Sequence, residues 1–219
     1  MMKKLEEEAK KQNVVSLKVK YYNLSYIDLF EKLLDKAGWD IPTVYSTFYH
    51  VDLAKVEHSF WNKRLFAIPS SYEIIRWDKV ITNELKEFKN LEEAEFQPYF
   101  FPLHRLEDIV PSCSFIIKQH DEIVAWSIIE QTIPRVLKYR MLYIREAHRQ
   151  AGLGVRLGME TARHIHNEEN DKLVIEVVTQ NKGMRKIVNK IKTTLSPTSY
   201  ECRTSEKLLE ESMHIIDNS

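Results

Sequence analysis

Hydrophobic and polar positions follow two different periods along the chain, and the changes of period mark the predicted elements. Runs rich in Val, Ile and aromatic residues predict strands, while apolar residues at three- to four-residue spacing predict amphipathic helices. Strands are expected over 72–77, 113–119, 122–132, 136–144, 173–179 and 200–205, and helices over 82–96, 152–167 and 183–191. The chain from about Ile68 onward is therefore expected to form an α/β domain with a mixed sheet.

The first 67 residues contain a strand and a helix that resemble a later part of the chain. Residues 17–23 and 26–37 follow the same pattern as 175–181 and 184–191, with Asn23 aligned on Asn181. This similarity predicts a weak internal repeat, although two unrelated strand–helix units can also look alike at this level. We expect an N-terminal βαβ-type extension over 1–67 and a second domain over 68–219.

The charges of the chain balance, with 32 Lys and Arg residues against 32 Asp and Glu residues. Because such a chain has no global field, neither nucleic acid nor a membrane surface is expected as a partner. Charged residues interrupt each apolar window before it reaches the roughly 18 residues of a membrane span. The start of the chain lacks a secretory signal, and Cys113 and Cys202 suggest no disulfide framework, so we expect a cytoplasmic protein.

Glycine is scarce in this chain, yet three of its five glycines fall close together, at positions 152, 154 and 158. They follow the strand that ends at Ile144 and open the next helix. Backbone N–H groups at such a helix start can converge on a phosphate. The spacing fits neither the dinucleotide motif nor the P-loop, and a plain strand-to-helix turn without a ligand is the alternative.

The segment Arg149-x-x-Gly152-x-Gly154 resembles the R/Q-x-x-G-x-G/A motif of the GNAT superfamily of acyl-CoA-dependent N-acetyltransferases. The strand before it, and the later strand, Asn181 and helix, resemble the same family. The resemblance covers Ile68 to about Ser205. It implies a GNAT-like mixed central sheet flanked by helices, with acetyl-CoA as co-substrate, an amine as acceptor and no metal.

The resemblance also implies a set of residues that bind acetyl-CoA. The loop would hold the pyrophosphate through its backbone, and the end of the preceding strand would pair with the pantetheine arm. That strand would be splayed away from residues 173–179, so that the thioester lies between the two. The implied binding residues are Leu142, Tyr143, Ile144, Arg149, Gln150, Ala151, Gly152, Leu153, Gly154, Val155 and Asn181.

The catalytic acid and base are less clear from the sequence. Where the family often has a Tyr that protonates the departing thiolate, this chain has Val188. Substitute acids are Tyr143, Tyr200 and Cys202, and solvent can also supply the proton. Candidate bases are Glu130, Glu146 and Glu176. Because Glu176 interrupts an apolar strand, we favour it, with Glu130 and Tyr143 as the other catalytic candidates.

Two further motifs, a pair of histidines and an aromatic segment, have simple structural explanations. His164 and His166 point about 200° apart on a helix, so they cannot share a metal ion and are expected at the surface. The aromatic segment Tyr99-Phe100-Phe101 corresponds in position to the acceptor loop of GNAT folds, but core packing explains it equally well.

The leading hypothesis is an N-acyltransferase in which an amine, on a small molecule or a peptide, attacks the thioester directly in a ternary complex. The alternative is a GNAT-fold protein that binds acyl-CoA without turnover, and the absence of the family's Tyr supports this alternative. A third interpretation is that the N-terminal unit lends a strand to a neighbouring sheet, which would make the protein a homodimer.

Overall fold

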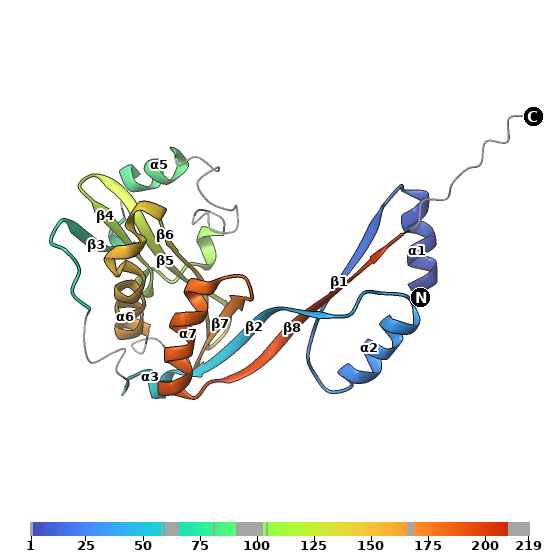
Figure 1. The fold of residues 1–219 in the computed structure, drawn as a ribbon. Coiled ribbons are helices and arrows are strands. Elements are labelled where there is room, and N and C mark those ends of the chain that lie inside the picture. Colours follow the sequence, from blue (N-terminus) through green and yellow to red (C-terminus); the bar gives the residue numbers. More distant parts are fainter. Residues whose placement is uncertain are drawn as a thin grey trace, which may run out of the picture. The chain divides into compact units, whose positions relative to one another are not determined.

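The computed structural model describes residues 2–57, 59, 66–80, 82–90, 103, 105–165 and 169–209. These residues form two compact units (Figure 1). The N-terminal unit contains the described residues of 1–48, 178–180 and 200–219, and the larger unit contains those of 49–177 and 181–199. No helix among the described residues is long and apolar enough to cross a membrane. The predicted boundary at residue 67 stays a prediction.

A mixed sheet organises the larger unit, as expected for a GNAT-like fold. Its strands are β3 (Tyr72–Arg76), β4 (Phe115–Gln119), β5 (Glu122–Ile133), β6 (Val136–Ile144) and β7 (Lys172–Val178). Successive strands from β3 to β6 pair antiparallel, whereas β6 and β7 pair parallel. His120, with a φ of 55°, lies in the turn between β4 and β5. The order of these strands in the sheet is β7-β6-β5-β4-β3.

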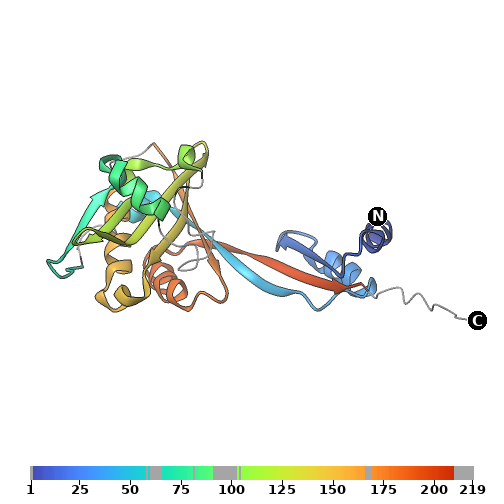
Figure 2. The same ribbon diagram turned by 90° about the horizontal axis from the view of Figure 1, so that it is seen from above.

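Helices cover both faces of this sheet (Figure 2). One face carries α6 (Leu153–Ile165) and α7 (Lys182–Leu195), with the short α3 (Leu53–Glu57) beside them. The other face carries α5 (Thr82–Asn90) over a core that includes Trp126. Among the described residues, the connections contain the 3₁₀ helices η1 (Trp77–Lys79), η4 (Leu106–Asp108), η5 (Pro111–Cys113) and η6 (Glu146–Ala151). The predicted aromatic segment 99–101 lies outside the described residues.

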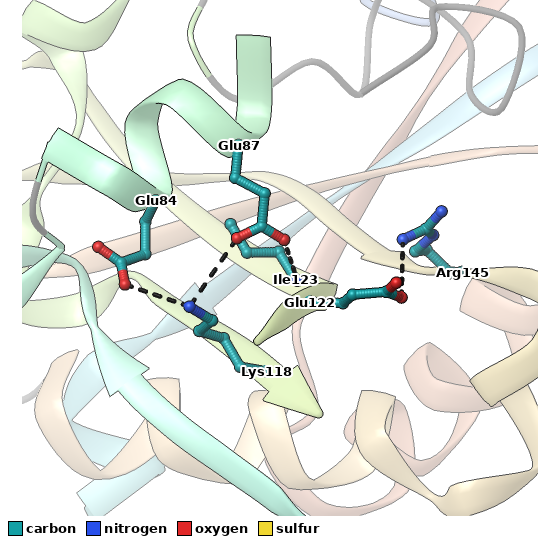
Figure 3. A network of polar contacts seen from close by, with 6 residues as sticks. All are labelled: Glu84, Glu87, Lys118, Glu122, Ile123 and Arg145. Atoms are coloured by element: carbon teal, nitrogen blue, oxygen red, sulfur yellow. Dashed lines mark hydrogen bonds and ion pairs between the residues drawn. The ribbon is translucent and has the colours of Figure 1, made fainter. Parts of the chain in front are cut away.

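Charged side chains attach α5 to the β4–β5 hairpin (Figure 3). Lys118 of β4 lies between two carboxylates of α5, with its Nζ 3.3 Å from Glu84 Oε1 and 3.9 Å from Glu87 Oε2. Glu87 also accepts a hydrogen bond from the backbone N–H of Ile123. Because Glu84 and Lys118 are largely buried, water screens this pair less than it would an exposed one. The network fixes the helix on the sheet face that lies opposite α6 and α7.

The N-terminal unit contains α1 (Met2–Lys11), β1 (Ser16–Tyr22), α2 (Ile27–Lys36), most of β2 (Thr43–Asp52) and most of β8 (Thr198–Leu208). The order β1-α2-β2 repeats the order β7-α7-β8, which agrees with the predicted internal resemblance. β1 pairs antiparallel with β8, so this unit uses the last strand of the described chain.

A polar contact joins three elements of the N-terminal unit. The hydroxyl of Tyr21 on β1 donates to Glu31 of α2 at 2.9 Å, and Arg203 of β8 forms an ion pair with the same carboxylate. Burial and the nearby carboxylate raise the pKa of Tyr21 to about 12. The phenol therefore stays protonated and keeps donating over the whole physiological pH range.

The C-terminal end of β2 and helix α3 belong to the core of the larger unit, although they precede residue 68. Val51, Leu53 and Val56 are each at most 3% exposed and pack with α6 and α7. Leu53→Ala is expected to lower the free energy of unfolding by about 2–5 kcal/mol, measured by chemical denaturation. A chain that starts at Ile68 lacks all three side chains and is expected to melt at a lower temperature or aggregate.

The matched control is Leu29→Ala on α2, because Leu29 is 60% exposed and its loss should change stability by no more than about 0.5 kcal/mol. If the chain from Ile68 kept the melting temperature of the full chain, residues 68–219 would form an independent domain and this packing argument would be wrong.

Candidate functional site

The glycine segment forms the expected connection between a strand and a helix. β6 ends at Ile144, η6 covers Glu146–Ala151, and α6 begins at Leu153. Between the two helices, Gly152 adopts a left-handed conformation with a φ of 73°. The first N–H groups of α6 have no acceptor within the helix and carry the positive end of its dipole. The loop therefore has the backbone geometry of an anion site.

The missing side chains of the two loop glycines face protein atoms. A Cβ at Gly152 would overlap the ring of Phe66, and its φ would be strained for any other residue. A Cβ at Gly154 would lie 3.1 Å from Ile144 Cδ1 and 3.7 Å from Leu142 Cδ2, on β6. Glycine is therefore needed at 152 for the turn, and at 154 it lets α6 pack closely on β6. Neither position depends on a ligand for this explanation.

The other predicted loop residues support the backbone. Arg149 donates from Nε to the carbonyl of Ile144 at 3.4 Å, which links the loop to the end of β6. Leu153 is buried and Val155 packs against the core, so both anchor the first turn of α6. Gln150 and Ala151 lie in η6, and the side chain of Gln150 lies outside the described residues.

The parallel strands β6 and β7 separate next to this loop. Their ladder runs from Val136 and Lys172 to its last pair, Tyr139 and Ile175. β6 nevertheless continues to Ile144 and β7 to Val178. In the pairing of β5 with β6, Ile128 faces Met141 and Ile129 faces Tyr139, so Arg140 is an extra, bulged residue. A bulge bends its strand, and here it coincides with the separation that the family resemblance implies.

A charged row crosses the sheet where the strands separate. It consists of Glu130 on β5, Lys138 and Arg140 on β6, and Glu176 on β7. Arg140 Nη1 lies 2.8 Å from Glu130 Oε1, and Lys138 Nζ lies 3.8 Å from Glu176 Oε2. Because Leu137, Tyr139, Ile175 and Val177 pack toward α6 and α7, strand alternation places Lys138 and Glu176 on the opposite face.

The two carboxylates of the charged row differ in accessibility. The side chains of Glu130 and Arg140 are only 4% and 8% exposed, so this pair is buried. The side chain of Glu176 is 20% exposed and its ion pair is longer. A buried, closely paired carboxylate is poorly placed to receive a proton from a substrate, whereas Glu176 remains accessible. Among the candidate bases, the geometry therefore favours Glu176.

The remaining acid and base candidates lie in different settings. Tyr143 is on the part of β6 that extends beyond the ladder with β7, stacked on Trp126 with ring centroids 4.5 Å apart. Val188 is 1% exposed in the core. Glu146 is 89% exposed at its side chain. Tyr200 and Cys202 belong to the N-terminal unit, where Tyr200 stacks on Phe48.

Asn181 has a local structural role. Its side-chain oxygen accepts the backbone N–H of Met184 at 2.9 Å and so caps the N terminus of α7. The contact with the pantetheine end that the resemblance implies stays a prediction.

His164 makes local contacts and gives no sign of a metal site. It contacts the carbonyl of Glu160 at 2.9 Å and packs edge-on against Phe115, and His166 lies outside the described residues. Among the residues that the structure describes, no three His, Cys, Asp or Glu side chains gather in a way that could hold a metal.

Sequence reasoning missed a buried hydroxyl cluster behind the separating strands. Ser127 Oγ lies 2.7 Å from the Tyr139 hydroxyl and 3.0 Å from Thr161 Oγ1. Burial raises the pKa of Tyr139, so the phenol stays protonated. The sequence features that could have indicated this cluster are a Ser within an apolar strand and a Thr on the apolar face of a later helix.

Sequence reasoning also missed His50 on β2. Burial and the charge of Lys172 lower the pKa of His50, which keeps the imidazole neutral near pH 7.

A glycine loop at a helix N terminus, beside parallel strands that separate, defines an α/β fold of the GNAT type. Comparisons with known proteins agree. Residues 77–190, more than half of the chain, match the family described as "Acetyltransferase (GNAT) family". The chain belongs to this family. A search of curated proteins found no match.

Solved structures share the fold at low sequence identity. The chain is similar to a tandem GNAT protein from the clavulanic acid biosynthesis pathway, with a TM-score of 0.65 and 13% identity over 94% of this chain and 67% of that one. A GCN5-related N-acetyltransferase from Sphaerobacter thermophilus gives 0.58 and 11%, over 91% and 64%. A protein of unknown function from Staphylococcus epidermidis gives 0.57 and 12%, over 95% and 80%. At these identities the likeness concerns the fold alone.

The buried ion pair of the charged row is expected to be essential for stability. Glu130→Gln removes the charge that the buried guanidinium of Arg140 faces, and breaking such a pair costs about 3–5 kcal/mol. Glu176→Gln makes the same chemical change in the same row at a more exposed pair, and should cost about 1 kcal/mol or less. Urea denaturation of both variants tests this order. Equal losses would show that the difference in burial between the two pairs does not set the cost of breaking them.

Proposed function

We propose that this protein transfers an acyl group, acetyl in the simplest case, from acyl-CoA to an amine within a ternary complex. The observation that carries the proposal is the separation of β6 from β7 after Tyr139 and Ile175, directly beside the N terminus of α6. Membership of the GNAT acetyltransferase family supports acyl transfer in general. We further propose that the reaction takes place in the cytoplasm.

Backbone groups would hold the acyl-CoA. The N–H groups at Gly152, Leu153 and Gly154, at the start of α6, suit a pyrophosphate. On the side of β6 that faces β7, the ladder ends at Tyr139, which leaves the backbone of Met141–Ile144 to pair with the amides of the pantetheine arm. Binding through these two backbone segments would fix the thioester where the strands separate. Positioning of this kind can supply much of the rate enhancement.

The chemistry then needs a base, an oxyanion donor and a proton for the leaving thiolate. Glu176 would take the proton as the amine nitrogen attacks the thioester carbonyl carbon, and a backbone N–H near the Arg140 bulge would stabilise the oxyanion. The carbon–sulfur bond breaks as the amide forms. Tyr143 or solvent would protonate the thiolate, because Val188, at the position of the family's Tyr, has no ionisable group.

Val188 also supports a second candidate function. A protein of this fold that binds acyl-CoA without turnover would need the loop and the separated strands but no catalytic acid. Release of CoA in the presence of a panel of primary amines separates the two candidates, because only the enzyme releases CoA faster than spontaneous hydrolysis.

The phosphate site can be tested with truncated ligands. CoA, desulfo-CoA and acetyl-CoA share the pyrophosphate and are expected to raise the melting temperature of the protein by similar amounts. Pantetheine, which lacks the pyrophosphate, should give a much smaller shift at the same concentration. Equal shifts with pantetheine and CoA, or no shift with any of them, would show that the loop is only a turn.

Glu176→Gln is expected to lower turnover by about 10²–10⁴-fold, because the amide cannot accept the proton of the amine. The dissociation constant for acetyl-CoA, measured by calorimetry, should stay within about twofold of the parent value. Glu146→Gln is the matched control, since Glu146 is exposed in the loop and should leave turnover unchanged. Parent-like turnover of Glu176→Gln would rule out this base.

A further inference from the structure

An apolar cavity of about 50 Å³ lies between the sheet and helices α6 and α7 in the larger unit. Its walls include Gly158 and Ala162 of α6 and Ile187 of α7. The last ladder pair of the separating strands, Tyr139 and Ile175, also lines it. One end of the cavity is therefore at the point where β6 and β7 separate.

The walls of the cavity are almost entirely apolar, so it is expected to hold no ordered water. The only hydroxyls among its lining residues are those of Tyr139 and Thr161, and both are within 3.0 Å of Ser127 Oγ. A buried water needs two to four polar partners, whereas apolar cavities stay empty and accept apolar guests. A void of this kind also weakens packing, since its walls lose contacts that a guest would restore.

We propose that this cavity receives the carbon chain of the acyl group, and that the preferred donor is a short-chain acyl-CoA of about four carbons. The inference rests on the proposed acyl transfer, which places the thioester at the end of the β6–β7 ladder. Since about 10–15 Å³ of such a cavity holds one water-sized group, the cavity has room for the two further carbons of a butyryl chain but not for the six of an octanoyl chain. The bonds made and broken are those of acetyl transfer, so no further reactant is needed.

Glycine at position 158 fits this assignment. In a helix interior, glycine is less favourable than alanine, so its presence in the middle of α6 calls for a local reason. Here it lines the cavity, so a larger residue at this position is expected to narrow the space that the acyl chain needs. Gly183 in the first turn of α7 offers a comparison, because a Cβ there would meet only Asn181 Oδ1, at an ordinary 3.6 Å.

The test measures dissociation constants of CoA, acetyl-CoA, propionyl-CoA, butyryl-CoA and octanoyl-CoA by calorimetry. Each buried methylene should tighten binding by about fourfold, so butyryl-CoA should bind about 15-fold more tightly than acetyl-CoA. Octanoyl-CoA exceeds the cavity and should lose most of this gain. In Gly158→Ala the preference for butyryl-CoA over acetyl-CoA should fall below about fourfold, while Gly183→Ala should keep it. Ala162→Val is a second variant that narrows the cavity should Gly158→Ala fold poorly.

Distinct outcomes separate this inference from the proposed function. If acetyl-CoA and butyryl-CoA bind the parent equally within twofold, the cavity does not take the acyl chain, although acyl-CoA binding stands. Equal changes in Gly158→Ala and Gly183→Ala would also overturn the assignment. If neither CoA nor any acyl-CoA binds, the proposed function fails, and this inference fails with it.

Discussion

The arrangement of the larger unit depends on the early end of the ladder between β6 and β7. A parallel pair that continued past Tyr139 and Ile175 would close the space beside the glycine loop. The bulge at Arg140 prevents this, because an extra residue bends β6 while the strand keeps its pairing with β5. The same bend brings the separated backbone, the helix N terminus of α6 and the charged row close together in the fold.

The polar groups around the bulge define the geometry of the strands more than they stabilise the fold. The Glu130–Arg140 pair is buried, and buried ion pairs rarely stabilise a fold more than apolar packing would. On the other face, the hydroxyls of Ser127, Tyr139 and Thr161 satisfy one another inside the core. Both the ion pair and these hydrogen bonds depend on direction, so they specify the point at which the strands separate more sharply than apolar contacts could. The apolar cavity beside them is a further loss of packing at the same place.

The N-terminal unit takes one of its strands from a segment that is distant in the sequence. Its strand–helix–strand order matches that of β7-α7-β8, and its first strand pairs with β8. Tyr21, Glu31 and Arg203 join β1, α2 and β8. The unit therefore forms only when both ends of the described chain come together, which gives it a high share of contacts between residues far apart in sequence.

The sequence by itself determined the features that are local. The strand, glycine turn and helix around Gly152 follow from the hydrophobic periodicity and from the clustered glycines. The sequence favoured Glu176 over Glu130 because Glu176 interrupts an apolar strand, but it could not show which carboxylate is buried, because burial and ion pairing depend on which strands are neighbours. The tertiary structure alone decided that Arg140 buries Glu130, that Gly154 packs against β6, and that a cavity lies below the separated strands. Each of these rests on strand register and on the approach of helices, and neither is encoded within a few neighbouring residues.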